Sequence, residues 1–421
     1  MTAISFSGVD TAILALYLLI TFYLGVVKKG GSGSAQDYLL AGRRVTLPAF
    51  VASLVSTWYG GILGVGEFSY RFGISNWLVF GVPYYLYALI FALFFARRAR
   101  RSELYTIPDQ LEKKYDRKTG IAGAGFIFIL SLPAPYIFML ASLIVLFLPL
   151  PMWQAIVIGA LFSFLYVVRN GFAAVVRTDL FQFVLMFAGF ILLLAFAVAK
   201  YGGFAFLRAN VPESHWSWHG GNSVQYILAW YVIAASTLID PNFYQRCYAA
   251  KSENTARNGI LLSVLFWIFF DLLTTSTGLY ARAVLPTLAN PVESYPLLAE
   301  TLLPSFAKGM FFVALFAPVM STLDSFAFVS GLTLGRDVLG KWRSSASDAS
   351  QQALVRFGLA VAFVLSIGLA LLTGSVIDMW YQLGSIATPA LLLPLLSSFS
   401  QRWRLVSRLA LASILCAGGT S

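Results

Sequence analysis

Apolar segments of about 20 residues, the length that a helix needs to cross a bilayer, recur along the whole chain. The sequence is 59% hydrophobic and only 11% charged, whereas a soluble domain is about a quarter charged. These features predict an all-α polytopic membrane protein. Its expected spans are residues 8–27, 47–68, 75–96, 120–148, 152–168, 179–199, 223–239, 259–281, 305–334, 357–374, 378–398 and a last one from 409.

The loops between these spans are short, and the sequence predicts a single transmembrane domain over residues 1–421. Residues 8–27 form a peripheral first span in this interpretation. The last apolar segment, 409–421, holds about a dozen residues, too few to cross a bilayer. It is therefore expected to be a partial, truncated last helix. No cleavable signal peptide is expected, because the start is uncharged before Asp10 and no small-residue cleavage site follows.

The net charge of +11 could suggest nucleic-acid binding, but the distribution of the basic residues argues against it. With the N-terminus outside, nearly all of them fall in inside loops, as cytoplasmic loops of membrane proteins require. The basic loops then set the topology and contact lipid headgroups. Of the 29 Lys and Arg residues, the outside keeps only Arg71, Lys200, Arg208, Arg282 and Lys308.

The segment Ala317–Ser325 places hydroxyls and a carboxylate inside an apolar span. Ionisable groups at membrane depth are costly and usually functional. Ser321 and Ser325 share one helix face, with Thr322 beside them. Clustered oxygens without Cys or His suit a hard cation such as sodium.

Several spans carry residues that break helices. Gly60, Gly61, Gly64 and Gly66 cluster in the second span, and each glycine costs a helix about 1 kcal/mol. The cluster indicates local unwinding or close helix packing. Prolines interrupt two further spans, and the carbonyls they free survive at membrane depth only where they line a cavity or bind something. These prolines are Pro133, Pro135 and Pro318.

Four stretches make the chain resemble the sodium/solute symporter family, which includes sodium/galactose, sodium/proline and sodium/sialic acid carriers. They occur in the family's order over residues of about 10–400. The resemblance implies a LeuT-like five-plus-five inverted repeat with flanking helices, the halves being 47–199 and 223–398. The stretches are Asp37–Arg44 with the following segment to Gly73, Gly171–Gln182, Asp240–Ser252 and Met320–Ser325.

The family's main sodium site lies between the spans that correspond to 47–68 and 305–334 here. The resemblance implies side-chain ligands from Ser321 and Thr322 and backbone ligands from Ser56, Tyr59 and Pro318. The alternative is that the two hydroxyls only bond back to carbonyls of their own helix, as buried Ser and Thr often do.

Some family members have a second ion site, and the matching residues here are Asp179, Asp324 and Ser325. Two carboxylates close together raise the pKa of one of them, so this site could hold a sodium ion or a proton. The alternative for Asp179 is a carboxylate that caps the helix of span 179–199 at its N-terminus.

The solute is expected at helix breaks in the two halves. Trp58, Glu67, Trp230 and Tyr231 are the candidate binding residues, because aromatic faces and a carboxylate stabilise a cation. The stretch from Ser56 to Gly61 resembles the high-affinity choline branch of the family, which hints at a zwitterionic or cationic solute. Simple aromatic packing is the alternative, and sugars and monocarboxylates remain open.

The resemblance implies a sodium-coupled symporter of the cytoplasmic membrane that imports a small polar organic solute by alternating access, with sodium as the coupling ion. A proton-coupled carrier and a transporter-like sensor of a longer signalling protein are the alternatives. An enzyme is not expected, because the spans hold no metal-ligand cluster or nucleophile–base pair, and no obligate protein partner is evident. Arg246 is interpreted as a surface charge at a helix end, and a gate salt bridge of the Gln245–Arg246 pair, with Asp240 six residues before Arg246, is the alternative. Asp271 has no assigned role.

Overall fold

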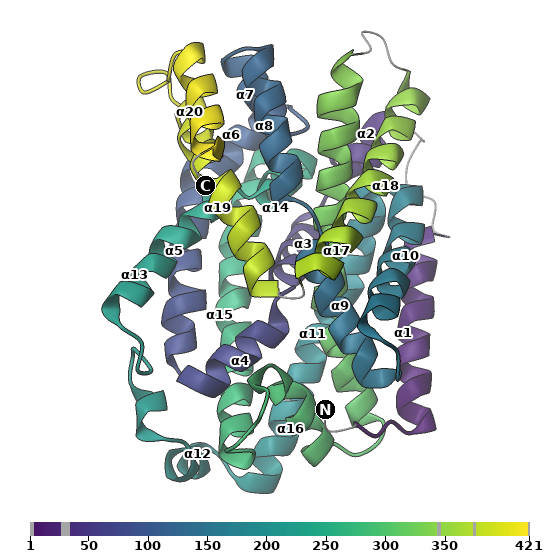
Figure 1. Cartoon of the computed structure of the whole chain (residues 1–421), viewed down its shortest axis with the longest axis vertical. Helices are drawn as coiled ribbons and strands as arrows, with labels where there is room; N and C mark the ends of the chain where they lie inside the picture. The colour runs from purple at the N-terminus through teal and green to yellow at the C-terminus, as the bar shows by residue number, and fades with distance from the viewer. Residues whose placement is uncertain (1–3, 27–33, 343–346, 374–375, 420–421) are drawn as a thin grey trace.

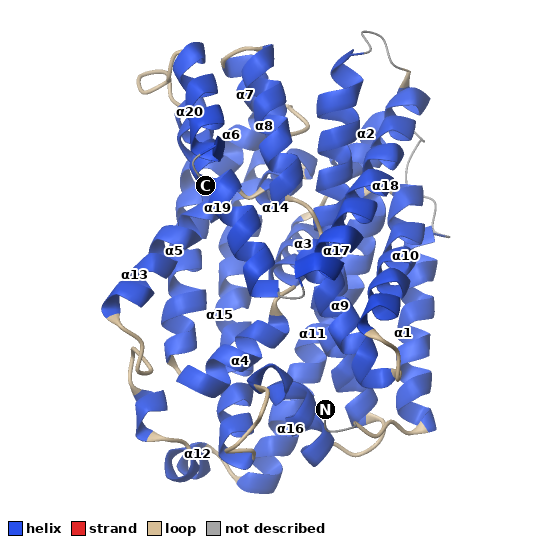
Figure 2. Cartoon of the chain, viewed as in Figure 1, coloured by secondary structure: helices blue, strands red, loops and turns tan. Residues whose placement is uncertain are grey.

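The computed structural model describes residues 4–26, 34–342, 347–373 and 376–419. Within these ranges the regular elements are all helices, as Figure 2 shows, and backbone pairing of the strand type is limited to a single bridge between Val45 and Ala250. Residues 420–421 of the expected last span lie outside the described residues, as do the basic residues Lys28, Lys29 and Arg343.

The helices follow one another along the chain with short connections. The α-helices are α1 (Gly8–Val26), α2 (Ala35–Leu40), α3 (Leu47–Trp58), α4 (Ile62–Phe72), α5 (Val82–Phe91), α6 (Arg97–Arg101), α7 (Ile107–Lys114), α8 (Arg117–Leu130), α9 (Ala134–Phe147), α10 (Met152–Asn170), α11 (Phe172–Tyr201), α12 (Phe204–Asn210), α13 (Val224–Ile233), α14 (Pro241–Ala249), α15 (Glu253–Val284), α16 (Ser294–Leu302), α17 (Ala307–Leu332), α18 (Asp348–Thr373), α19 (Val376–Ser398) and α20 (Ser407–Gly419). Short 3-10 or π-helical segments join them: η1 (Ala41–Arg43), η2 (Trp77–Gly81), η3 (Ala92–Ala96), η4 (Glu213–Trp216), η5 (Ala234–Ile239), η6 (Pro291–Glu293), η7 (Thr333–Leu339) and η8 (Gly340–Trp342).

The described residues form eight helices long and apolar enough to cross a membrane, or nine if the bent pair α3–α4 counts as one span. Most expected spans match a helix closely, as α1 and α10 do. The expected span 223–239 is not one regular helix. The α-helix α13 ends at Ile233 and continues as the 3-10 segment η5, which ends before α14 begins. Pro241 has no amide hydrogen to continue the helix, and the Asp240 carboxylate caps α14 by accepting from the Asn242 amide at 2.7 Å.

The prolines act differently in the two spans that contain them. Span 120–148 is divided into α8 and α9, with Pro133 at the N-cap of α9. Pro318, by contrast, lies inside the continuous helix α17. The expected interruption at Pro133 is therefore confirmed, whereas Pro318 leaves its helix unbroken.

Helix α17 lies at the centre of the molecule. It packs against α11, α3, α18, α1 and α9, and is buried along almost its whole length (Figure 1). Figure 1 also places α7 and α20 at the end opposite to α12, α16 and the N-terminus. The hydroxyls and the carboxylate of α17 are thus enclosed by other helices.

Asp10 joins the first turn of α1 to that of α17. Its Oδ1 accepts from the amides of Phe306 and Gly309 at 3.0 and 2.9 Å, and its Oδ2 accepts from the amide and hydroxyl of Ser7 at 3.0 and 2.7 Å. We expect Asp10→Ala to lower the free energy of unfolding by about 2–3 kcal/mol, because four donors lose a charged acceptor. Thermal unfolding of the purified protein measures this.

Asp116→Ala provides the control for that variant. Asp116 caps only α8, accepting from the amide and hydroxyl of Thr119 at 2.8 and 2.9 Å. A single cap contributes about 1 kcal/mol. Equal losses for the two variants would contradict a joint between α1 and α17.

Candidate functional site

The break between α3 and α4 forms the centre of the site. The two helices are bent by 61° across it, and Gly60 and Gly61 lie in the turn. The last carbonyls of a helix lack intrahelical partners, and its C-terminus carries partial negative charge. An added Cβ on Gly60 would lie 2.6 Å from the Thr322 hydroxyl oxygen. The break therefore packs directly on α17, and the Thr57 carbonyl near the end of α3 faces α17.

The candidate sodium ligands Ser56, Ser321, Thr322 and Pro318 meet at this contact. The hydroxyl oxygens of Ser321 and Ser56 lie 2.9 Å apart. The Thr322 hydroxyl lies 2.7 Å from the Thr57 carbonyl on α3 and 2.8 Å from the Pro318 carbonyl on its own helix. Both hydroxyls thus contact α3, the Thr322 hydroxyl also bonds back along α17, and the Ser321 hydroxyl lies 2.6 Å from the carboxylate of Asp179 in the same buried cluster of oxygens.

Tyr59, the remaining candidate sodium ligand, is the C-cap of α3. Its carbonyl accepts from the Ile62 amide at 3.1 Å. Its phenol donates to Asp271 on α15 at 2.9 Å. Tyr59 therefore connects the oxygen cluster to a second polar group.

Arg246 is fully buried, so the interpretation as a surface charge at a helix end is wrong. Its guanidinium donates to the hydroxyls of Ser53, Thr57 and Ser325 at 3.0, 2.7 and 2.8 Å. It also pairs with the carboxylate of Asp179 at 3.4 Å. The cation comes from α14, which the break before Pro241 turns into the interior, and it joins α14 to α3, α11 and α17.

The structure brings two of the three second-ion candidates together. Asp179 lies two turns inside α11, so the alternative of an N-terminal cap is wrong. Its Oδ1 accepts from the Ser321 hydroxyl at 2.6 Å and its Oδ2 from the Ser53 hydroxyl, and it shares Arg246 with Ser325. Asp324 instead accepts from the Tyr166 phenol on α10.

The four candidate solute residues do not form one group. Trp58 lies in an aromatic cluster with Tyr84, Phe243 and Trp267, at ring-centroid distances of 5.2, 5.9 and 5.0 Å. Trp230 and Tyr231 belong to a separate apolar cluster around Phe68, Val79 and Ile227. Glu67 pairs with Arg71 at 3.0 Å, so its charge is matched within α4.

The structure gives Asp271 two hydrogen-bond donors that the sequence did not suggest. It is buried, and both its oxygens accept from phenols, one from Tyr59 and the other from Tyr85 on α5. The signal in the sequence was a carboxylate four residues after Trp267 in an apolar span, which puts both on one face of α15. Its partners are distant in sequence and could not be inferred.

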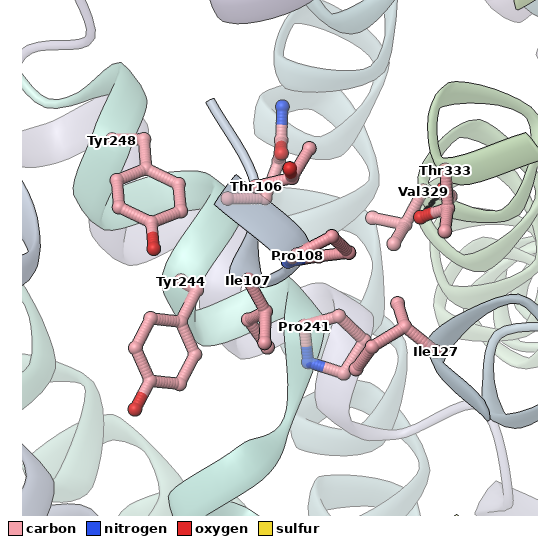
Figure 3. Close-up of a pocket in the computed structure, with 10 residues that line it drawn as sticks. Thr106, Ile107, Pro108, Ile127, Pro241, Tyr244, Tyr248, Val329 and Thr333 are labelled. Carbon is pink, nitrogen blue, oxygen red and sulfur yellow. Dashed lines mark hydrogen bonds between the residues drawn. The ribbon is translucent and has the colours of Figure 1, made fainter. Parts of the chain in front are cut away.

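A small cavity of about 10 Å³ lies between α7, α8, α14 and α17. Figure 3 shows Tyr244 and Tyr248 on one side of it and Val329 and Thr333 on the other. The cavity has room for about one water molecule. No organic solute fits there in this conformation.

Comparison with known proteins gives concordant results. A family model described as "Sodium:solute symporter family" matches residues 38–414. The sodium/glucose cotransporter of Vibrio parahaemolyticus is 27% identical over 85% of this chain and 73% of its own length. The high affinity choline transporter 1 of Homo sapiens is 24% identical over 87% of this chain and 69% of its own length.

A solved structure of a Na+-coupled sialic acid symporter, in a substrate-bound outward-open state, has a similar fold. It superposes with a TM-score of 0.78 at 18% identity, covering 94% of this chain and 86% of that one. The LeuT-like fold expected from the sequence is therefore confirmed. Because the family model covers most of the chain, this protein belongs to the sodium:solute symporter family.

Proposed function

We propose that this chain imports a small polar organic solute together with sodium across the cytoplasmic membrane, with its N-terminus outside. The oxygen cluster between the end of α3 and the middle of α17 carries the proposal, because it joins helices of the two expected halves, 47–199 and 223–398. The topology is supported by the basic segment α6, which lies near α7, at the end opposite to the N-terminus.

Sodium would bind where Thr322 and Ser321 now bond to α3. The ion would take the two hydroxyls and the carbonyls of Ser56, Tyr59 and Pro318 as ligands, in place of the direct bonds that now involve these hydroxyls. The negative end of the α3 dipole adds to the attraction. Five neutral oxygens hold a monovalent hard cation without trapping it.

The bound ion would tie the α3–α4 break to α17 and favour the outward-open form. The solute then binds next to the break, where Trp58 and its aromatic neighbours lie. Movement of α3, α4 and α14 against α17 would open the inside. In a cytoplasm with little sodium the ion leaves and the tie is lost.

A melting-temperature measurement tests the sodium site. We expect sodium, compared with potassium at equal ionic strength, to raise the melting temperature of the purified protein, because a ligand that binds only the folded state stabilises it. At ten times its Kd the ion adds about 1.4 kcal/mol. Thr322→Ala and Ser321→Ala should each remove this rise.

Thr277→Ala is the matched control for Thr322→Ala. Thr277 is buried in α15, and its hydroxyl bonds back to the Leu273 carbonyl at 2.7 Å. This variant should keep the full sodium response. A sodium rise that survives Thr322→Ala, or that Thr277→Ala also removes, would contradict the site.

A proton-coupled carrier is the second candidate, and Asp324 favours it. Within the described part of the chain, its buried Oδ1 has no hydrogen-bond partner, which leaves this oxygen free to take up a proton. Asp179 suits this role less well, because Arg246 and two hydroxyls already hold it. The melting temperature without sodium would then depend on pH, and Asp324→Asn would remove this dependence. That result would identify protons rather than sodium as the coupling ion.

A further inference from the structure

Asp271 is a buried carboxylate that no basic side chain of the described residues pairs with. It lies in the middle of α15 and is 5% exposed. The phenols of Tyr59 and Tyr85 donate to its oxygens, but none of the ion pairs in the described part of the chain includes it. An anion held at this depth is costly unless a cation joins it. The sodium ligands do not use it.

Aromatic faces stand beside this carboxylate. Trp267 lies one turn before Asp271 on the same face of α15, and the Tyr59 phenol lies within 3.2 Å of the Trp267 carbonyl and 2.9 Å of Asp271. The Trp267 ring is 5.0 Å from that of Trp58, which is 5.2 Å from that of Tyr84. Trp faces attract cations more strongly than other rings do.

The Trp267 side chain also carries an unused donor. It is fully buried, and its indole N–H has no hydrogen-bond partner among the residues that the structure describes. Buried donors are almost always paired in native proteins, so an unpaired one calls for an explanation. A ligand that brings an acceptor oxygen would supply the missing partner.

We propose that Asp271, Trp58 and Trp267 form the recognition site for the solute, and that the solute is a small organic ammonium ion. Its positive charge faces Asp271 and the two indole rings, and a hydroxyl or carboxylate oxygen accepts from the Trp267 indole. The inference rests on the proposed function, because it assigns the solute that accompanies sodium.

Tyr59 links this site to the ion. Its carbonyl is a candidate sodium ligand, while its phenol holds Asp271. Sodium binding therefore fixes the residue that orients the carboxylate. Ammonium binding should consequently be tighter in sodium than in potassium.

Titrations of the melting temperature of the purified full chain test the proposal. The probes are tetramethylammonium, choline and ethanolamine in a fixed concentration of sodium, with 3,3-dimethylbutan-1-ol as the neutral isostere of choline. We expect at least one ammonium probe to stabilise the protein and the neutral alcohol to have no effect. Asp271→Asn should weaken the ammonium probe by about 30-fold or more, because the buried partner of its charge is lost.

Two controls make the outcomes distinct. Asp116→Asn keeps a good helix cap far from the site, and should leave the affinity for the probe unchanged. Asp271→Asn should still melt higher in sodium than in potassium, which shows that it is folded. Three results would overturn the inference. Sodium could stabilise the wild-type protein while no ammonium probe does, or the neutral alcohol could raise the melting temperature as much as choline does. Asp271→Asn could also bind the ammonium probe as tightly as the wild-type protein does. Absence of any sodium response would instead count against the proposed function.

Discussion

Arg246→Met is expected to lower the free energy of unfolding by about 3–5 kcal/mol, the loss that follows when one partner of a buried ion pair is removed. The reason is that Asp179, fully buried, would keep its charge without a cation. Ser53, Thr57 and Ser325 would lose their donor as well. Thermal unfolding in a single detergent, compared with the wild-type protein, measures the effect.

Two further variants show whether the loss comes from the pair. Arg246→Met combined with Asp179→Asn leaves no unpaired charge, and should recover most of the stability. Arg101→Met removes a pair with Glu253 in which the arginine side chain is 71% exposed, and such pairs contribute about 0–1 kcal/mol. If Arg246→Met were no worse than Arg101→Met, Arg246 would not hold the helices together.

The Arg246 pair also bears on ion coupling. The guanidinium donates to Ser325 and pairs with Asp179, two of the residues that the family resemblance assigns to a second ion. A second cation at these oxygens would have to displace the guanidinium or share Asp179 with it. A single sodium between α3 and α17 is therefore the simpler arrangement.

The sequence predicted the architecture well because the bilayer imposes a length on each helix. The apolar segments 8–27 and 152–168 correspond to α1 and α10 within two residues at each end. The glycines at 60–61 marked the break between α3 and α4. Membership of the family confirmed the symporter function, and sodium as the coupling ion, and it spoke against an enzyme.

The short helix α14 shows why part of the site could not be predicted. Its nine residues are all buried, although they include Asn242, Gln245 and Arg246. No apolar pattern marks a helix whose polar groups are satisfied by distant segments. Arg246 finds Ser53 and Asp179, 193 and 67 residues away in the sequence.

Gly60→Ala is expected to weaken the sodium response strongly by filling the contact between α3 and α17. The new methyl group would lie 2.6 Å from Cβ and Oγ1 of Thr322, so either the threonine or the helix break must move. Overpacking of this kind costs about 1–3 kcal/mol. Because the displaced hydroxyl is a candidate ligand, we expect sodium affinity to fall about tenfold or more, as 1.4 kcal/mol corresponds to a factor of ten.

Gly64→Ala is the matched control, one turn further along the same segment. An added Cβ on Gly64 meets nothing within 4 Å, and alanine favours a helix over glycine by about 1 kcal/mol. This variant should melt at the same temperature as the wild-type protein or higher, with its sodium response intact. Close packing against α17 therefore accounts for the glycine at position 60, whereas the glycine at position 64 has no such contact. A sodium response that Gly60→Ala kept would mean that the ion binds away from the contact between the break and Thr322.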